Sequence, residues 1–235
     1  MKSAKSKHFV GGLLLLLVSG APAIASASAQ TLAFVVQKDA EEGPKASDAM
    51  VAERLQNLGY AVRILDQADA ATAAQEADAV VISSSVSANK LEGKYRDFPK
   101  PVILWESYLL PHMGMAGLKE EGDYGTKEHT RYAWLVNAPH PLSAGLESGL
   151  VNIYAKNGAM NWGTPGLGAT IIATIPGDPE KVLEFSYEKG ATMDYQNIAP
   201  GRRVFLFLDA TFPNLNESGL KLFDEAIRWS VETPQ

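Results

Sequence analysis

The sequence has 235 residues, a formal net charge of −6 and no cysteine. The absence of cysteine excludes disulfides and thiol nucleophiles, and it removes most kinds of structural zinc site. An acidic chain without a basic patch argues against nucleic acid and anionic membrane surfaces as partners.

The first 29 residues have the pattern of a secretory signal peptide. Lys2, Lys5 and Lys7 form a basic start, an apolar run follows over 9–18, and 27–29 read Ala-Ser-Ala, a small-residue cleavage site. The apolar run is shorter than the roughly 20 residues that a membrane span needs. We therefore expect cleavage after Ala29, export to the periplasm or the medium, and no membrane span in the mature chain.

The mature chain would be one domain over residues 30–235. Removing the leader takes away three lysines and no acid, so the remaining 206 residues carry a net charge of −9. Its first half alternates strand and helix patterns. Apolar runs predict strands over 31–36, 60–65, 79–83 and 102–105. Between these strands, apolar residues at helical spacing predict helices over 48–58, with Ser47 as the cap, over 68–76 and over 91–97. This alternation indicates βαβ units and a parallel sheet.

After residue 108 the pattern loosens into an irregular, glycine-punctuated stretch. Further strands are expected over 132–136, 150–155, 169–175, 182–187 and 203–208, with a loop over 162–166. A last helix is expected behind a Ser218 cap, with Trp229 on its buried face. We therefore predict an α/β fold of flavodoxin-like type, with a mostly parallel sheet and helices on both faces.

Three short motifs occur in order along the chain. They are Trp105-Glu106-Ser107 at a strand end, the turn His140-Pro-Leu-Ser-Ala-Gly-Leu146, and Gly201-Arg-Arg-Val-Phe-Leu-Phe-Leu208-Asp209. Together they resemble the class I glutamine amidotransferase-like superfamily, especially its trehalose-utilisation (ThuA-like) branch, over most of 31–231. The resemblance implies a flavodoxin-like sheet. It does not imply glutamine hydrolysis, because those amidotransferases use a Cys nucleophile and this chain has none. Exported domains of this type that lack the thiol also look like accessory modules of bacterial secreted proteins.

Glu106 is the leading candidate for a functional residue. It follows an apolar strand, and ligands of open α/β sheets bind beyond the carboxyl ends of strands. Partial burial there would raise its pKa and suit it to acid or base work, although a carboxylate can also serve as a structural acceptor for loop N–H groups. Ser107 comes next as a possible nucleophile, in a triad with His140 and Asp209, yet it lacks the small neighbours of a nucleophile elbow. His140 precedes a proline, so it fits a turn residue as well as a proton carrier.

Four other residues are candidates for ligand binding. Tyr108 follows the same strand as Glu106. Ser84 lies in the serine run after 79–83 and Asp209 follows 203–208, so both belong at the same sheet edge. Trp162, between Asn161 and a glycine in the expected loop, fits a platform for a sugar ring or a packing anchor. His112 and His129 have no metal-ligand spacing and no glycine-rich phosphate loop is present, so we expect neither a metal nor a cofactor.

The leading hypothesis is a non-catalytic binding or accessory module for a small polar molecule or carbohydrate. One alternative is a hydrolase or sugar-modifying enzyme that uses Glu106 as acid or base with His140. Another is a protein interaction domain that uses 114–125 and an apolar patch around Leu109, Leu110 and Met113. The sequence indicates no oligomeric state, and it leaves open which ligand is bound.

Overall fold

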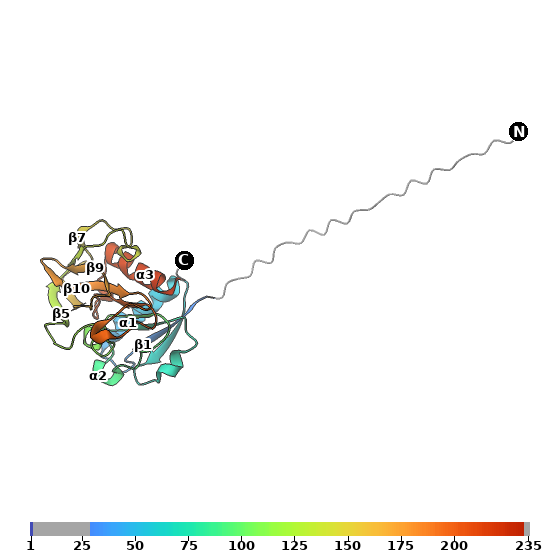
Figure 1. Cartoon of the computed structure of the whole chain (residues 1–235), viewed down its shortest axis with the longest axis horizontal. Coiled ribbons are helices and arrows are strands. Elements are labelled where there is room, and N and C mark those ends of the chain that lie inside the picture. The colour runs from blue at the N-terminus through green and yellow to red at the C-terminus, as the bar shows by residue number, and fades with distance from the viewer. Residues whose placement is uncertain (2–28, 233–235) are drawn as a thin grey trace.

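Five parallel strands form the centre of the structure, a computed structural model that describes residue 1 and residues 29–232 (Figure 1). Their order across the sheet is β2-β1-β3-β4-β11. Their bounds are β1 Thr31–Val36, β2 Ala61–Asp66, β3 Ala79–Ile82, β4 Val102–Leu104 and β11 Arg203–Phe205. All four neighbouring pairs are parallel. This core confirms the predicted flavodoxin-like α/β fold.

An antiparallel extension continues the sheet beyond β11, in the order β10-β9-β6-β7. The bounds are β6 Tyr132–Leu135, β7 Gly149–Asn152, β9 Thr170–Ile175 and β10 Asp178–Tyr187. A further pair, β5 Tyr124–Thr130 and β8 Gly158–Gly163, joins the sheet through a bridge from β8 to β10. The sequence pattern does not predict β5 or β8, because both stretches contain glycine and neither alternates cleanly between apolar and polar residues.

Two long helices cover one face of the sheet and short helical turns cover the other. α1 Glu42–Asn57 and α3 Glu217–Val231 share an apolar cluster with the buried side chains on one face of β1, β3 and β4. The opposite face packs against α2 Ala88–Leu91 and short 3₁₀ turns, and Figure 1 shows α2 at the lower rim of the domain. The 3₁₀ turns are η1 Ala71–Ala74, η2 Ser107–Leu109, η3 Pro141–Ser143, η4 Asp194–Gln196 and η5 Phe212–Asn214.

The helix starts differ from those predicted. α1 begins at Glu42 and takes Pro44 into its first turn, where a missing N–H costs nothing, so Ser47 is buried inside the helix instead of capping it. α3 is capped by Asn216, whose side chain accepts a hydrogen bond from the Gly219 N–H. The helical segment expected over 68–76 is only the single turn η1, since tertiary context overrides the helix propensity of its alanines.

Arg203 in β11 is wholly buried and holds the segment before β4 in place. Its guanidinium donates hydrogen bonds to the backbone carbonyl oxygens of residues 96, 98, 100 and 202, at 2.6–3.0 Å. Burial lowers its pKa to about 10. The contacts fix the chain between α2 and β4, which is the segment that carries one wall of the cleft described below. No helix in residues 29–232 combines the length and apolar character that a bilayer crossing requires, and the predicted signal peptide lies almost entirely outside the described residues.

Candidate ligand-binding site

Glu106 stands where β4 ends and the turn η2 begins. It is the N-cap of η2, and its Oε1 accepts a hydrogen bond of 2.9 Å from the backbone N–H of Tyr108. The residue is only 9% exposed. Glu106 therefore acts as a structural acceptor for a loop N–H, which was the alternative interpretation of this residue. A small part of its surface nevertheless remains exposed to solvent.

Burial raises the pKa of Glu106 to about 8. The hydrogen bond from Tyr108 works in the opposite direction, and the negative charge of Asp209 adds to the rise. At pH 7 the group is therefore mostly a neutral acid, which can donate a hydrogen bond as well as accept one. The sequence-based expectation of a raised pKa at this strand end agrees with this environment.

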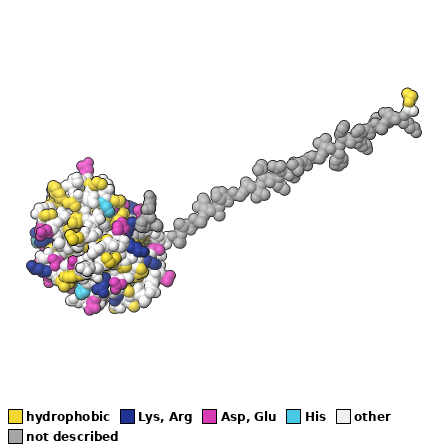
Figure 2. Space-filling view, viewed as in Figure 1, with side chains coloured by type: hydrophobic (Ala, Val, Ile, Leu, Met, Phe, Trp, Pro, Cys, Tyr) yellow, Lys and Arg dark blue, Asp and Glu magenta, His cyan; other side chains and the backbone are white. Residues whose placement is uncertain are grey.

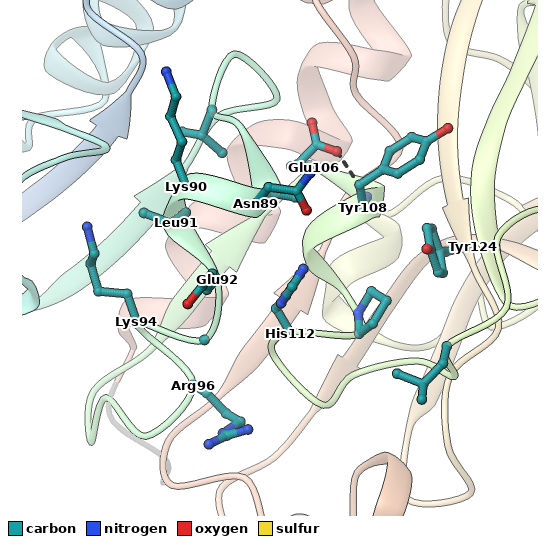
Figure 3. A pocket seen from close by; sticks show the side chains of 15 residues that line it. Asn89, Lys90, Leu91, Glu92, Lys94, Arg96, Glu106, Tyr108, His112 and Tyr124 are labelled. Carbon is teal, nitrogen blue, oxygen red and sulfur yellow. Dashed lines mark hydrogen bonds between the residues drawn. The ribbon is translucent and has the colours of Figure 1, made fainter.

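An open cleft of about 1090 Å³ lies in front of Glu106. Tyr108 and Tyr124 line it on one side, α2 with the turn after it lines the other, and His112 lies between them (Figure 3). In Figure 3 the side chains of Asn89 and His112 extend toward each other beside Glu106. Polar side chains from α2, from η2 with the turn after it, and from β5 thus line one cleft together with the Glu106 carboxyl group, and a binding pocket commonly has a few such polar groups.

Two tyrosines form the aromatic wall of the cleft. The rings of Tyr108 and Tyr124 meet edge to face with centroids 5.4 Å apart, and Tyr108 remains 40% exposed. The Tyr108 hydroxyl donates a 2.9 Å hydrogen bond to Glu120, which raises the pKa of Tyr108 to about 12. The phenol therefore stays neutral, and its ring is held at a fixed angle with part of its surface open.

Asn161 fixes the strand ends behind the cleft. Its side-chain amide donates hydrogen bonds to the carbonyl oxygens of Trp105 (2.7 Å) and Leu208 (2.9 Å), while its Oδ1 accepts from Thr126 (2.7 Å). These bonds join the chain after β4 to the chain after β11 and to β5. In the sequence, Asn161 is notable only as the neighbour of Trp162. A polar residue within an otherwise buried stretch was the one signal that could have revealed it.

Ser107 is not placed to act as a nucleophile. It is 0% exposed, and its hydroxyl points to Asn161 Oδ1 at 3.4 Å, behind the cleft. Its assignment as a catalytic residue is therefore wrong in this structure. The turn η2 directs the Glu106 and Tyr108 side chains toward the cleft and the intervening serine into the core.

Ser84 and Asp209 lie near the expected sheet edge but do not line the cleft. Asp209 is half-buried, and burial raises its pKa. It acts on the site at a distance, because its charge favours the neutral form of Glu106. The serines beside Ser84 are engaged within the fold: Ser83 donates to Asp48, and Ser85 accepts from a backbone N–H at 3.1 Å.

His140 lies at the opposite end of the parallel strands from Glu106. Its Nδ1 accepts a 3.2 Å hydrogen bond from the Leu142 N–H, and its ring packs edge to face on Trp229 at 5.3 Å. Trp229 in turn stacks under the guanidinium of Arg202, the residue just before β11. Burial lowers the pKa of His140. The proposed pairing of Glu106 with His140, and with it the Ser107 triad, is therefore wrong.

Trp162 is also a packing residue. It lies within β8, not in a loop, and is 1% exposed, with the Lys181 ammonium 4.6 Å from its ring centroid. It cannot stack on a ligand, so this assignment is wrong. The next residue, Gly163, packs closely against Leu110, since a Cβ at position 163 would come within 2.4 Å of a Leu110 methyl carbon. Leu109, Leu110 and Met113 are each 0% exposed, which rules out the predicted apolar patch.

His112, which the sequence did not indicate as a site residue, lines the cleft with Glu106. The irregular stretch that contains it gave no periodicity from which its position could be read. Within residues 29–232 no three histidine, aspartate or glutamate side chains gather as a metal site.

Comparison with known proteins reveals relatives at the level of fold. No family model matches the sequence, and no curated protein matches it. A protein described as ThuA-like from Bacteroides uniformis superposes with a TM-score of 0.58 at 12% identity, over 90% of this chain and 95% of that one. A second protein so described, from Parabacteroides merdae, has a TM-score of 0.53 at 13% identity, over 87% and 90%.

A protein described as a GMP synthase component from Thermoplasma acidophilum has a TM-score of 0.54 at 13% identity, over 85% and 93% of the two chains. The chain has the ThuA-like, glutamine amidotransferase-like fold. This confirms, at the level of fold, the resemblance carried by the three sequence motifs. At these identities the likeness extends to the fold alone, because one fold hosts many functions.

Proposed function

We propose that this protein is an exported binding or accessory module that holds a small polar molecule, in particular a carbohydrate, in the cleft in front of Glu106. The observation that carries the proposal is a buried, mostly neutral carboxyl group opening into a cleft with an aromatic wall. Buried polar groups of this kind lower stability unless a partner satisfies them, so they occur preferentially at functional sites.

The chemistry of the cleft suits sugar hydroxyls. A neutral carboxyl group, the amide of Asn89 and the imidazole of His112 together offer hydrogen-bond donors and acceptors. This suits a ligand rich in hydroxyl groups, because each hydroxyl both donates and accepts a hydrogen bond. The exposed part of the Tyr108 ring offers an apolar surface for the C–H face of a sugar. Glutamine amidotransfer by the thiol route is excluded, because the chain has no cysteine.

Export is part of the proposal and rests on the leader pattern. Lysines and an apolar run are followed by Ala27-Ser28-Ala29, and only Gln30 lies between Ala29 and the first strand. N-terminal sequencing of the protein secreted by a bacterial host tests it, with Gln30 expected as the first residue. An intact N-terminus on a cell-retained protein would contradict export.

The binding proposal is tested by isothermal titration calorimetry of residues 30–235 against a panel of mono- and oligosaccharides and polar metabolites. We expect at least one ligand to bind and Tyr108→Ala to weaken it roughly tenfold. Tyr195→Ala is the matched control, because Tyr195 is 61% exposed and lies outside the cleft lining. Absence of binding across the panel, or equal weakening by both variants, would argue against this site.

A second candidate function is hydrolysis with Glu106 as general acid. It is favoured by the raised pKa of Glu106 and by the presence of a second titratable side chain, His112, in the same cleft. Incubation of each bound saccharide with the protein, followed by chromatography of the products, distinguishes the two. Turnover lost in Glu106→Gln would establish the enzyme, whereas an unchanged saccharide supports the binding module.

A further inference from the structure

The cleft concentrates positive charge in an otherwise acidic protein. Lys90, Lys94 and Arg96 line it together, from α2 and the turn that follows. The described residues that line the cleft include two carboxyl groups, Glu92 and Glu106, and burial raises the pKa of Glu106 to about 8. The whole chain carries a net charge of −6, and on the face seen in Figure 2 basic and acidic side chains are interspersed. The excess of cations in the cleft is therefore a local feature and does not follow from the overall composition.

Of these cations, Lys90 and Arg96 are the more available to a ligand. The Lys94 ammonium already donates to the carbonyl oxygens of Gln67 (2.6 Å) and Asp69 (2.9 Å), which fixes the position of its charge. Lys90 makes no ion pair within residues 29–232. The Arg96 Nε lies 3.7 Å from a carboxylate oxygen of its exposed neighbour Asp97, which is a loose ion pair. The guanidinium N–H groups of Arg96 can therefore donate hydrogen bonds to a ligand.

The cations and the aromatic wall occupy different parts of the cleft. In Figure 3 Lys90, Lys94 and Arg96 lie along one side, while Tyr108 and Tyr124 lie on the other, with His112 between them. The volume of about 1090 Å³ slightly exceeds the roughly 300–1,000 Å³ usual for sites of drug-sized ligands. A ligand that fills the cleft would therefore be longer than one sugar ring and would meet positive charge along one edge.

We infer that the ligand of this cleft is an acidic oligosaccharide, whose carboxylate or sulfate groups lie along Lys90 and Arg96 while a sugar ring lies against Tyr108. This inference rests on the proposed function and specifies the ligand class of the same site. A long polyanion such as nucleic acid is disfavoured, because the acidic surface outside the cleft would repel it. A short chain that stays within the cleft gains the local attraction without that repulsion.

The test is calorimetry at low and high salt with three probes of equal length: an oligogalacturonate, a sulfated galacto-oligosaccharide and a neutral galacto-oligosaccharide. The double variant Lys90→Gln/Arg96→Gln is compared with Lys189→Gln, which removes an exposed cation outside the cleft. Neither changed cleft residue is buried, so the double variant should fold, and its melting curve verifies this.

We expect at least one acidic probe to bind roughly tenfold more tightly than the neutral probe at low salt. Salt and the double variant should each remove that preference, while Lys189→Gln keeps it. The two acidic probes distinguish carboxylate from sulfate. Equal, salt-independent binding of the neutral probe would overturn the acidic ligand class but leave the binding function standing. Failure of all three probes would overturn the inference, and the broader panel then decides the proposed function separately.

Discussion

Replacing Glu106 by glutamine should stabilise the protein at neutral pH and remove part of its pH dependence. The fold raises the pKa of this group from 4.5 to about 8. An acid with a raised pKa in the folded state contributes full stability only below its unfolded pKa, and it lowers stability progressively as the pH rises from about 4.5 to about 8. Glutamine mimics the neutral acid, and its amide oxygen can still accept the Tyr108 N–H.

The size of the effect follows from the shift. At 1.36 kcal/mol per pKa unit, the shift of Glu106 amounts to about 5 kcal/mol above pH 8 and about 3 kcal/mol at pH 7. Urea denaturation at a series of pH values gives the difference in unfolding free energy between Glu106→Gln and the wild-type protein. That difference should be near zero at about pH 4.5 and should reach about 3 kcal/mol in favour of the variant at pH 7.

Glu180→Gln is the matched control for this series, because Glu180 is an exposed glutamate on β10. It should leave the curve almost unchanged at every pH. A difference for Glu106→Gln that stays flat between about pH 4.5 and pH 8 would refute the reasoning, since the carboxyl group would then titrate alike in both states. A large loss of stability at pH 7 would mean that Glu106 is ionised and held by its partners, which makes it a structural residue.

Three further variants test other parts of the structure. Arg203→Met should lower the unfolding free energy by about 3 kcal/mol or more, because four carbonyl oxygens lose their donor; thermal melting measures it. Glu184→Met should raise the melting temperature at pH 7, because Glu184 is wholly buried, neither carboxyl oxygen has a hydrogen-bond partner within residues 29–232, and burial raises its pKa well above the usual range. An unchanged or lower melting temperature would contradict this. His140→Ala should lower the unfolding free energy by about 1 kcal/mol, because η3 loses its cap, and should leave ligand binding unchanged. Weaker ligand binding by this variant would show that His140 belongs to the binding site.

The parallel half of the fold could be predicted because its signals are local. The run over 32–36 is apolar throughout, since β1 is buried on both faces between β2 and β3. Where strands are parallel, the residue after each strand lies at the same sheet edge, and this rule correctly placed Glu106 and Tyr108 at a cleft.

The antiparallel half could not be predicted in the same way. Loops between antiparallel strands alternate between the two sheet edges, so the position of His140 in the chain did not reveal at which end of the sheet it lies. Trp162 looked like a loop residue because glycine follows it, yet that glycine exists to admit close packing against Leu110. Burial of this kind depends on partners far away in sequence, which no local pattern records.

The measurement that tests the central claim most directly is backbone NMR shift mapping of isotope-labelled protein titrated with the pooled saccharide and metabolite panel. If the cleft is the binding site, the amide signals of Asn89, Glu106, Tyr108 and His112 should shift on titration and those near His140 should not. Signals that stay fixed throughout, or shifts confined to residues outside the cleft, would contradict the assignment of this cleft as the functional site.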